Sequence, residues 1–143
     1  MAKNLKLDVV TPEGQALSRE VTEVVLPGLR GSFGVLPGHM PLIAALQPGI
    51  LKFTDPDGET IYAIGGGYAE VTPQKVIVLA DTADPAEEID LEAARRARRQ
   101  ALAQLKQGVR GAALDAAELS LKKALAQLQV ADFLRRRGKP TGR

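Results

Sequence analysis

The 143-residue chain carries 19 Lys and Arg against 17 Asp and Glu, with 45% hydrophobic residues and no cysteine. The absence of cysteine excludes disulfide bonds, cysteine-ligated zinc and thiol catalysis, and a single histidine, His39, excludes zinc motifs that need two. No apolar run is long enough to span a membrane, and the N-terminal residues lack the apolar core of a signal peptide.

The first part, residues 1–83, is predicted to be a β domain. Alternation of apolar and polar residues predicts a strand over 5–10, and β-branched residues predict another over 21–26. Turn signals separate further strands over 42–46, 50–54, 60–64, 68–72 and 75–80. Short strands with frequent turns indicate an antiparallel β-sandwich or flattened barrel.

Gly65-Gly66-Gly67 is predicted to interrupt the strand before it, as a bulge or a tight bend. A phosphate cradle is disfavoured, because the next element is a strand and not the N-terminus of a helix.

The second part, residues 84–143, is predicted to be an antiparallel helical hairpin with a short basic tail, which gives an α+β chain in two parts. Asp84 before Pro85, or Asp90 slightly later, can cap a first helix that reaches Gln107. Glycines at 108 and 111 end it, and a second helix follows over 112–137. The seam between the helices is rich in alanine, and burial stabilises by only about 25 cal/mol per Å² of apolar surface. The hairpin is therefore predicted to depend on docking to the β part or to another protein.

The charge is divided unevenly along the chain. Residues 1–80 hold six Lys and Arg against eight Asp and Glu, a net charge of −2. Residues 93–143 hold thirteen against three, a net charge of +10. The densest basic residues are Arg95, Arg96, Arg98, Arg99, Lys122, Lys123 and Arg135 to Arg137. A solvated helix face, a nucleic-acid contact and docking onto an acidic protein surface all explain them, although Phe133 is the only aromatic residue there for base stacking.

His39 lies between Pro37 and Pro41 in a stretch, residues 31–49, that is dense in glycine and proline. A catalytic triad is disfavoured, because no serine lies in a nucleophile-elbow context. An interface role and a plain surface turn remain open for this histidine.

The same stretch carries a family resemblance. G-S-F-G-V-L-P-G-H-M-P-L over residues 31–42 resembles the signature of the epsilon subunit of bacterial and chloroplast F-type ATP synthases. L-D-V-V-T-P-E-G at 7–14, G-G-G-Y-A-E-V at 65–71 and V-I-V-L-A-D-T-A at 76–83 match in family order and spacing.

The resemblance implies a non-catalytic rotor subunit of a proton-translocating ATP synthase, at the cytoplasmic face of the bacterial plasma membrane. Its implied partners are the gamma subunit, the ring of c subunits and the catalytic hexamer of alpha and beta subunits. The residues implied to contact gamma and the ring are Arg30, Gly31, Phe33, Gly34, Pro37, Gly38, His39 and Pro41. The hairpin is implied to inhibit ATP hydrolysis through Arg95, Arg96, Arg98, Arg99, Lys122, Lys123, Arg135 and Arg136. The alternative is a nucleic-acid-binding or adaptor protein that uses the basic hairpin.

One family motif is altered. Some members bind ATP through an I/L-D-x-x-R-A motif at the start of the first helix. Here Ile89 and Asp90 match, but Ala93 replaces the arginine. Arg95 is two residues further on, about 200° around a helix, and cannot substitute. The chain is therefore expected to use no cofactor and no metal, and any nucleotide contact is limited to Ile89 and Asp90.

Overall fold

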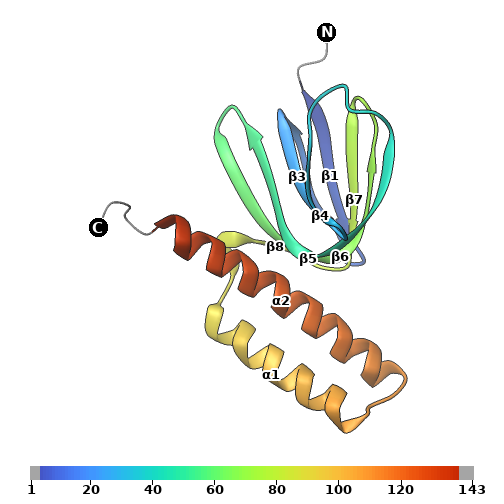
Figure 1. The fold of residues 1–143 in the computed structure, drawn as a ribbon, viewed down its shortest axis with the longest axis vertical. Helices are drawn as coiled ribbons and strands as arrows, with labels where there is room; N and C mark the ends of the chain where they lie inside the picture. The colour runs from blue at the N-terminus through green and yellow to red at the C-terminus, as the bar shows by residue number, and fades with distance from the viewer. Residues whose placement is uncertain (1–3, 139–143) are drawn as a thin grey trace.

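The computed structural model describes residues 4–138, and the predicted basic tail after Gly138 lies outside the described residues. A β domain forms one end of the molecule, and two antiparallel helices cross beneath it (Figure 1). The strands are β1 (Leu5–Thr11), β2 (Gly14–Val21), β3 (Glu23–Gly28), β4 (Gly31–Val35), β5 (Leu42–Asp55), β6 (Gly58–Val71), β7 (Lys75–Ala80) and β8 (Ala83–Pro85). A 3₁₀ turn, η1 (Ala86–Glu88), leads to the helices α1 (Leu91–Gln107) and α2 (Ala112–Gly138). This confirms the predicted β-sandwich followed by a helical hairpin.

The strands form one open sheet in the order β2-β1-β7-β6-β5-β3-β4, with β8 also paired to β6. β1 and β7 are parallel, so the prediction of a wholly antiparallel sheet was wrong at this pair. These two strands are far apart in sequence, and such pairings are not constrained by a hairpin turn to run antiparallel. The sheet also extends past the boundary drawn at residue 83, since Asp84 and Pro85 pair with Ala63 and Tyr62.

β2 was missed, and β4 was expected only as a short strand without bounds within residues 31–49; both lie at the edges of the sheet. β2 buries only Leu17 and Val21, and β4 buries only Val35. Because edge strands have few buried positions, their sequences show little hydrophobic pattern. The predicted strand over 21–26 is two strands, divided at Thr22.

Partway along the long β5–β6 ribbon, the side of the strands that faces the core changes. The sheet folds into a sandwich at this point. In β5 the core residues are Leu46 and then Leu51 and Phe53, so the buried positions change from even to odd. β6 makes the same change, from Ile64 to Ala69 and Val71. Each change falls at glycines, Gly49 in β5 and residues 65–67 in β6. A strand that bends in this way passes from one layer of a sandwich to the other.

Gly65-Gly66-Gly67 bend β6, which was one of the two predicted alternatives, but they neither interrupt the strand nor form a bulge, and that part of the prediction was wrong. The β5–β6 register runs without a shift from Leu42 opposite Val71 to Asp55 opposite Gly58. A Cβ on Gly65 would lie 2.2 Å from Thr82 Oγ1, and one on Gly67 would lie 2.0 Å from the carbonyl oxygen of Leu79. The glycines therefore allow the chain after β7 to approach the bend closely.

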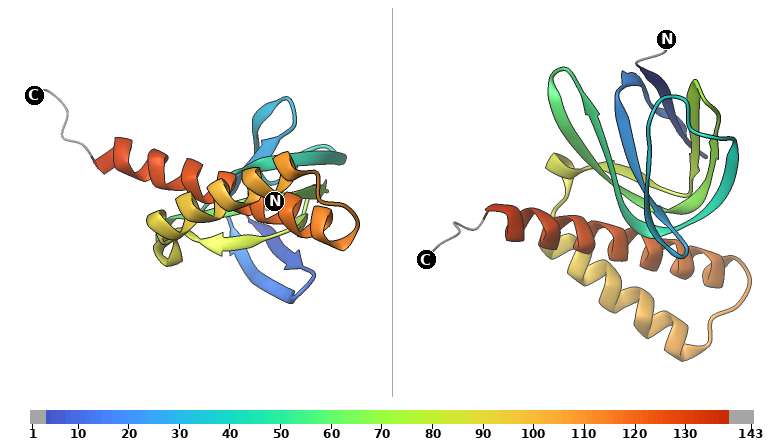
Figure 2. Two further views of the ribbon diagram at one scale, coloured as in Figure 1. Left: turned by 90° about the horizontal axis from the view of Figure 1, so that it is seen from below. Right: turned by 45° about the horizontal axis from the view of Figure 1, so that its top comes forward.

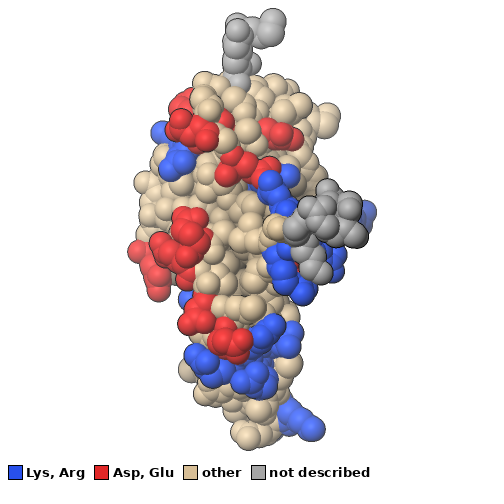
Figure 3. Space-filling view, turned by 90° about the vertical axis from the view of Figure 1, so that its left-hand side faces the viewer, with Lys and Arg blue, Asp and Glu red and all other residues tan. Residues whose placement is uncertain are grey.

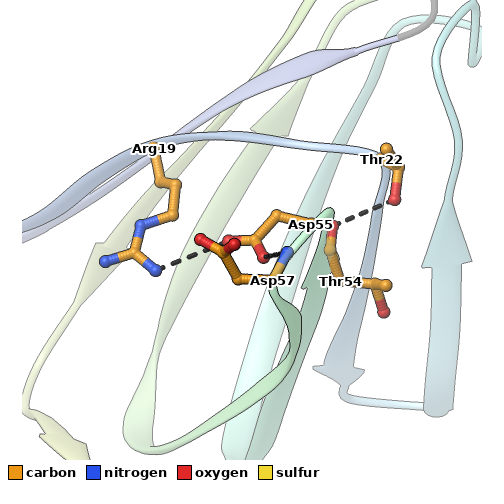
Figure 4. Close-up of polar contacts among 5 residues, drawn as sticks. All are labelled: Arg19, Thr22, Thr54, Asp55 and Asp57. Carbon is orange, nitrogen blue, oxygen red and sulfur yellow. Dashed lines mark hydrogen bonds and ion pairs between the residues drawn. The ribbon is translucent and has the colours of Figure 1, made fainter.

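A buried carboxylate fixes the far end of the ribbon (Figure 4). Asp55, 8% exposed, accepts a hydrogen bond of 2.8 Å from the backbone N–H of Asp57 and pairs with Arg19 at 3.5 Å. Beside it, Thr22 donates from its backbone N–H and its hydroxyl to the carbonyl oxygen of Thr54. The β5–β6 turn is thus tied to the corner between β2 and β3.

Asp90 is the N-cap of α1, and its carboxylate accepts from the backbone N–H of Ala93 at 3.1 Å. Asp84, the other predicted cap, lies in β8. Gly108 ends α1 in the left-handed conformation at φ 79°. The buried residues of the seam are alanines, namely Ala94, Ala101, Ala117 and Ala124. α2 packs against β5 and β6, and α1 lies on the outer side of α2 (Figures 1 and 2).

Candidate functional site

Backbone hydrogen bonds, one of them to the neighbouring turn at Pro73, hold the signature loop, residues 36–41, in place. Gly38 has φ 86° and donates to the carbonyl oxygen of Pro73 at 2.8 Å, while the backbone N–H of His39 donates to Leu36. His39 Nδ1 lies 2.7 Å from the carbonyl oxygen of Met40. Because a carbonyl oxygen only accepts, Nδ1 carries the proton. The ring of His39 therefore helps to hold the loop in shape.

The structure does not bring the predicted contact residues into one surface. Gly31 pairs with Gly28 at one end of β4, and Val35 pairs with Val24 at the other. Pro27 of β3 and Gln129 of α2 both lie beside Gly49, so Arg30 and Gly31 lie at the end of the sandwich nearer to α2. The backbone N–H of Gly38 donates to Pro73 and that of Lys6 donates to Gln74, so the loop with Gly38 and His39 lies at the opposite end, near the start of β1. Between them Phe33 is half-buried against the core, and Gly34 is exposed.

The outer side of the sheet beside this loop carries an apolar face that sequence reasoning missed. Two cross-strand rows build it, one of Val10, Leu79, Tyr68 and Ala45 and one of Asp8, Ile77, Glu70 and Ile43. We call its apolar members, Val10, Ile43, Ala45, Tyr68, Ile77 and Leu79, the apolar face. Ile43 is 74% exposed, Tyr68 60% and Leu79 55%. A contiguous exposed apolar surface of this kind marks an interaction site.

Two carboxylates border this face differently. Asp8 accepts a hydrogen bond from the Ser18 hydroxyl at 2.7 Å, which together with Lys75 lowers the pKa of Asp8 below its usual value. Glu70 has no ion-pair partner among residues 4–138.

The hairpin rests on the opposite end of the β5–β6 ribbon through a small apolar cluster. Ala126 and Val130 of α2 are buried against Ile61 and Ala63 of β6. Ile50, Ala86, Ile89 and Phe133 pack around them, half-buried. The hairpin is thus docked on the sandwich.

Polar contacts surround this cluster. Lys122 pairs with Asp81 at 3.7 Å and Lys123 with Asp84 at 4.0 Å. At the other end of α2, Arg137 donates to Glu59, which also pairs with Lys52 at 3.4 Å. The hydrogen bond from Arg137 lowers the pKa of Glu59 below its usual 4.5. Gln129 adds a hydrogen bond of 3.2 Å to the carbonyl oxygen of Pro48.

The remaining cations among the described hairpin residues form no ion pair with the sandwich. Arg95 pairs with Glu92 within α1, and Arg135 and Arg136 pair with Asp132 within α2. Arg96, Arg98 and Arg99 are exposed and have no ion-pair partner among the described residues. In the side view of Figure 3, Lys and Arg gather mainly over the lower, helical part, and Asp and Glu mainly over the sandwich above it.

The altered nucleotide motif borders a groove between α1 and α2, lined in part by Asp90, Ala93, Lys123 and Gln127. The Asp90 carboxylate is engaged as the cap of α1, and Ala93 supplies no charge. Lys123 and Gln127 both contact Asp84. These residues do not fit a triphosphate, which requires cations free to meet it.

Among residues 4–138, no group of three or more His, Asp or Glu side chains is placed to hold a metal ion. No helix among the described residues is both long and apolar enough to cross a membrane.

Comparison with known families matches nearly the whole chain. Residues 4–86 match the beta-sandwich domain of the ATP synthase delta/epsilon chain, and residues 87–132 match the long alpha-helix domain of the same chain. The ATP synthase epsilon chain of Moorella thermoacetica is 42% identical over 129 residues, which cover 90% of this chain and 96% of that one. The epsilon chain of Anaeromyxobacter dehalogenans is 45% identical over 130 residues, covering 89% and 97%.

Solved structures agree. A chain in the mitochondrial ATP synthase of Euglena gracilis, a structure of OSCP, F1 and the c-ring, superposes with a TM-score of 0.71 at 28% identity and covers 92% of this chain and 82% of that one. A chain in the central stalk and c-ring of the Tetrahymena thermophila mitochondrial enzyme, at 14% identity and a TM-score of 0.55, shares the fold.

Proposed function

The chain belongs to the epsilon-chain family of F-type ATP synthases, and we propose on that premise how its surfaces work in the complex. The epsilon chain is a structural and regulatory part of the F1 central stalk, and the catalytic sites of the complex are in the beta subunits. It joins the membrane through the complex. The alternative of a nucleic-acid-binding or adaptor protein is not favoured by these matches.

The sandwich is proposed to dock through two surfaces. The apolar face, with the signature loop of Pro37, Gly38, His39 and Pro41 at its border, takes the gamma subunit. Its breadth and exposure support a lasting contact, because such a contact needs a large apolar patch. The turn at the far end of β4, with Leu29, Arg30 and Gly31, takes the c-ring, since one partner surface does not easily reach both ends of the strand. We propose that the chain acts at the cytoplasmic face of a bacterial plasma membrane, and the bacterial relatives support this.

The gamma contact is tested by charge placed in the apolar face. Tyr68→Glu and Leu79→Glu should each weaken capture by the cognate gamma subunit at least tenfold, because a carboxylate must be desolvated in the interface. Gln74→Glu, at an exposed position off this face, is the matched control. Unfolding midpoints in urea establish that the variants are folded. Undiminished capture by both face variants would remove this surface as the gamma site.

The hairpin is proposed to inhibit ATP hydrolysis when it leaves the sandwich and brings its cations to acidic segments of the beta subunits. The observation that supports this is the docking interface, which has only four buried side chains surrounded by exposed ion pairs. Two positions of the hairpin are then close in free energy, as a switch requires.

Removal of the hairpin tests the inhibition. Truncation after Ile89 preserves β8 and η1. A cut at Asp84 would instead remove the pairing of β8 with β6. The truncated chain should assemble normally and raise hydrolysis in the reconstituted complex. Unchanged hydrolysis with normal assembly would contradict an inhibitory hairpin.

We further propose that the hairpin binds no ATP tightly and needs no cofactor. The support is the occupied Asp90 carboxylate and the missing cation at Ala93. Isothermal titration of the full chain with ATP should give no heat that fits a dissociation constant below about 1 mM, a free energy of about −4 kcal/mol. Tight binding would overturn this proposal.

A further inference from the structure

Two groups of cations on the docked hairpin differ in their partners. Lys122, Lys123 and Arg137, here called the clamped cations, pair with Asp81, Asp84 and Glu59, here called the clamp acids. Arg96, Arg98 and Arg99 have no ion-pair partner among residues 4–138 and are exposed while the hairpin is docked.

The clamped cations lie at both ends of the docking interface. Lys122 and Lys123 precede the buried Ala126 and Val130, and Arg137 follows them. At 1.5 Å per residue the two ends are about 20 Å apart along α2. The clamp acids come from separate elements, Glu59 from the start of β6 and the other two from the segment around β8. The sandwich therefore presents a spaced set of carboxylates along one helix.

We propose that the clamp acids compete with an acidic partner segment for the clamped cations, and that this competition sets when the hairpin leaves the sandwich. This inference rests on the proposed inhibitory role of the hairpin. A ligand shifts a two-state equilibrium only by its difference in affinity for the two states. The arginines of α1 are available in both states, so they attract an acidic segment without favouring release. The clamped cations are free only after release, so they alone make an acidic partner favour the released hairpin.

The exposure of the clamped pairs makes such competition feasible. Each cation is about half-exposed, and exposed ion pairs change an equilibrium constant by roughly fivefold at most. A segment with several carboxylates can therefore replace them together.

The test follows docking in the full chain, without the rest of the complex. The chain has no cysteine, so Gln74→Cys on the sandwich and Gln107→Cys at the end of α1 give two specific sites for a donor and an acceptor dye. Hexaglutamate is the acidic probe, and sodium chloride at equal ionic strength is the control for screening. In the parent chain the probe should lower energy transfer at concentrations where the salt control does not.

Two sets of variants separate the groups. Glu59→Gln, Asp81→Asn and Asp84→Asn together should raise the ratio of released to docked hairpin about tenfold without any probe. The matched control, Glu13→Gln, Glu20→Gln and Glu23→Gln, removes three exposed carboxylates from the sandwich and should leave docking unchanged.

Among the cations, the first variant combines Arg96→Gln, Arg98→Gln and Arg99→Gln. It should bind the probe severalfold more weakly, but at saturating probe its released fraction should equal that of the parent. Lys122→Gln, Lys123→Gln and Arg137→Gln together should make docking insensitive to the probe. The proposal is overturned if this last variant responds to the probe as the parent does, or if removal of the clamp acids leaves docking unchanged. Competition that is intact in the isolated chain, with no inhibition in the complex, would instead contradict the proposed function.

Discussion

The two parts of the chain bury very different side chains. The sandwich encloses seventeen buried residues in one cluster, with Phe53 and several leucines at its centre. The hairpin seam buries alanines, and only Ala126, Val130, Ile61 and Ala63 are buried where α2 meets the sandwich. Because stabilisation grows with the apolar area removed from water, we expect the sandwich to be stable on its own and the hairpin to depend on its neighbour. Changes in one part should therefore leave the other part largely intact.

The largest effect is expected in the sandwich core. Phe53→Ala should lower the free energy of unfolding by about 3–5 kcal/mol, because it leaves a cavity at a fully buried site. Urea denaturation followed by circular dichroism measures it. Phe133→Ala, at the half-buried margin of the docking cluster, is the comparison and should hardly move the midpoint for the sandwich. Equal losses from the two changes would mean that the parts unfold as one unit.

A charge at the docking interface should separate the two parts. Val130→Asp places a carboxylate without a partner where α2 meets β6, at a cost of about 3 kcal/mol or more. Undocking avoids that cost, so the docked-to-released ratio should fall at least about 100-fold. Energy transfer between dyes at residues 74 and 107 measures this ratio. The strand signal in circular dichroism should persist, because the sandwich stays folded. Ala116→Asp, at an exposed position of α2, is the control. Docking that survives Val130→Asp would contradict the assignment of this cluster as the contact that holds α2 on the sandwich.

Gly67 in the bend of the ribbon should tolerate substitution less well than Gly14 at the start of β2. Gly67→Ala combines φ 135° with a clash against the carbonyl oxygen of Leu79, and should cost about 2 kcal/mol. Gly14→Ala has a similar φ of 127° but an open surrounding, so it should cost about 1 kcal/mol. The difference in unfolding free energy between the two variants measures the close approach by itself. Equal costs would mean that backbone strain alone requires glycine in the bend.

Local patterns predicted the helices well. Asp90, Gly108 and the Ala and Leu spacings determine the ends and the seam of the hairpin, because capping and helical periodicity act over a few residues. The sandwich was predicted as a class for the same reason, since turn residues and alternation are local.

Features that depend on distant pairing were not predictable in this way. The parallel pairing of β1 with β7, and the close approach of Leu79 and Thr82 to Gly65 and Gly67, arise from contacts between segments far apart in sequence. The apolar face needs four strands in register before Val10, Tyr68 and Leu79 become neighbours. Its only sequence signal was apolar residues at positions facing away from the core, in strands with apolar residues on both sides. The division of the hairpin cations likewise required the docked geometry.

The smallest effect is a dependence of docking on pH through Glu59. The hydrogen bond from Arg137 lowers the pKa of Glu59 in the docked state. The docked state therefore binds this proton more weakly than the released state does. The contribution of this pair is therefore complete above the ordinary value of 4.5 and is lost as pH falls through and below it. Since Arg137 is half-exposed, the docked-to-released ratio should fall only about two- to fivefold between pH 6 and pH 4. The charged groups that meet Glu59 are Lys52 on the sandwich and Arg137 on α2. The pKa of Asp132 on α2 is likewise lowered, by its hydrogen bond from Arg135 and by the charge of Arg136. Glu59→Gln removes the titrating group at this contact and should flatten most of the dependence, whereas Glu20→Gln should not. A parent chain whose docking strengthens on acidification would contradict the role of this pair and show that repulsion among carboxylates governs the interface.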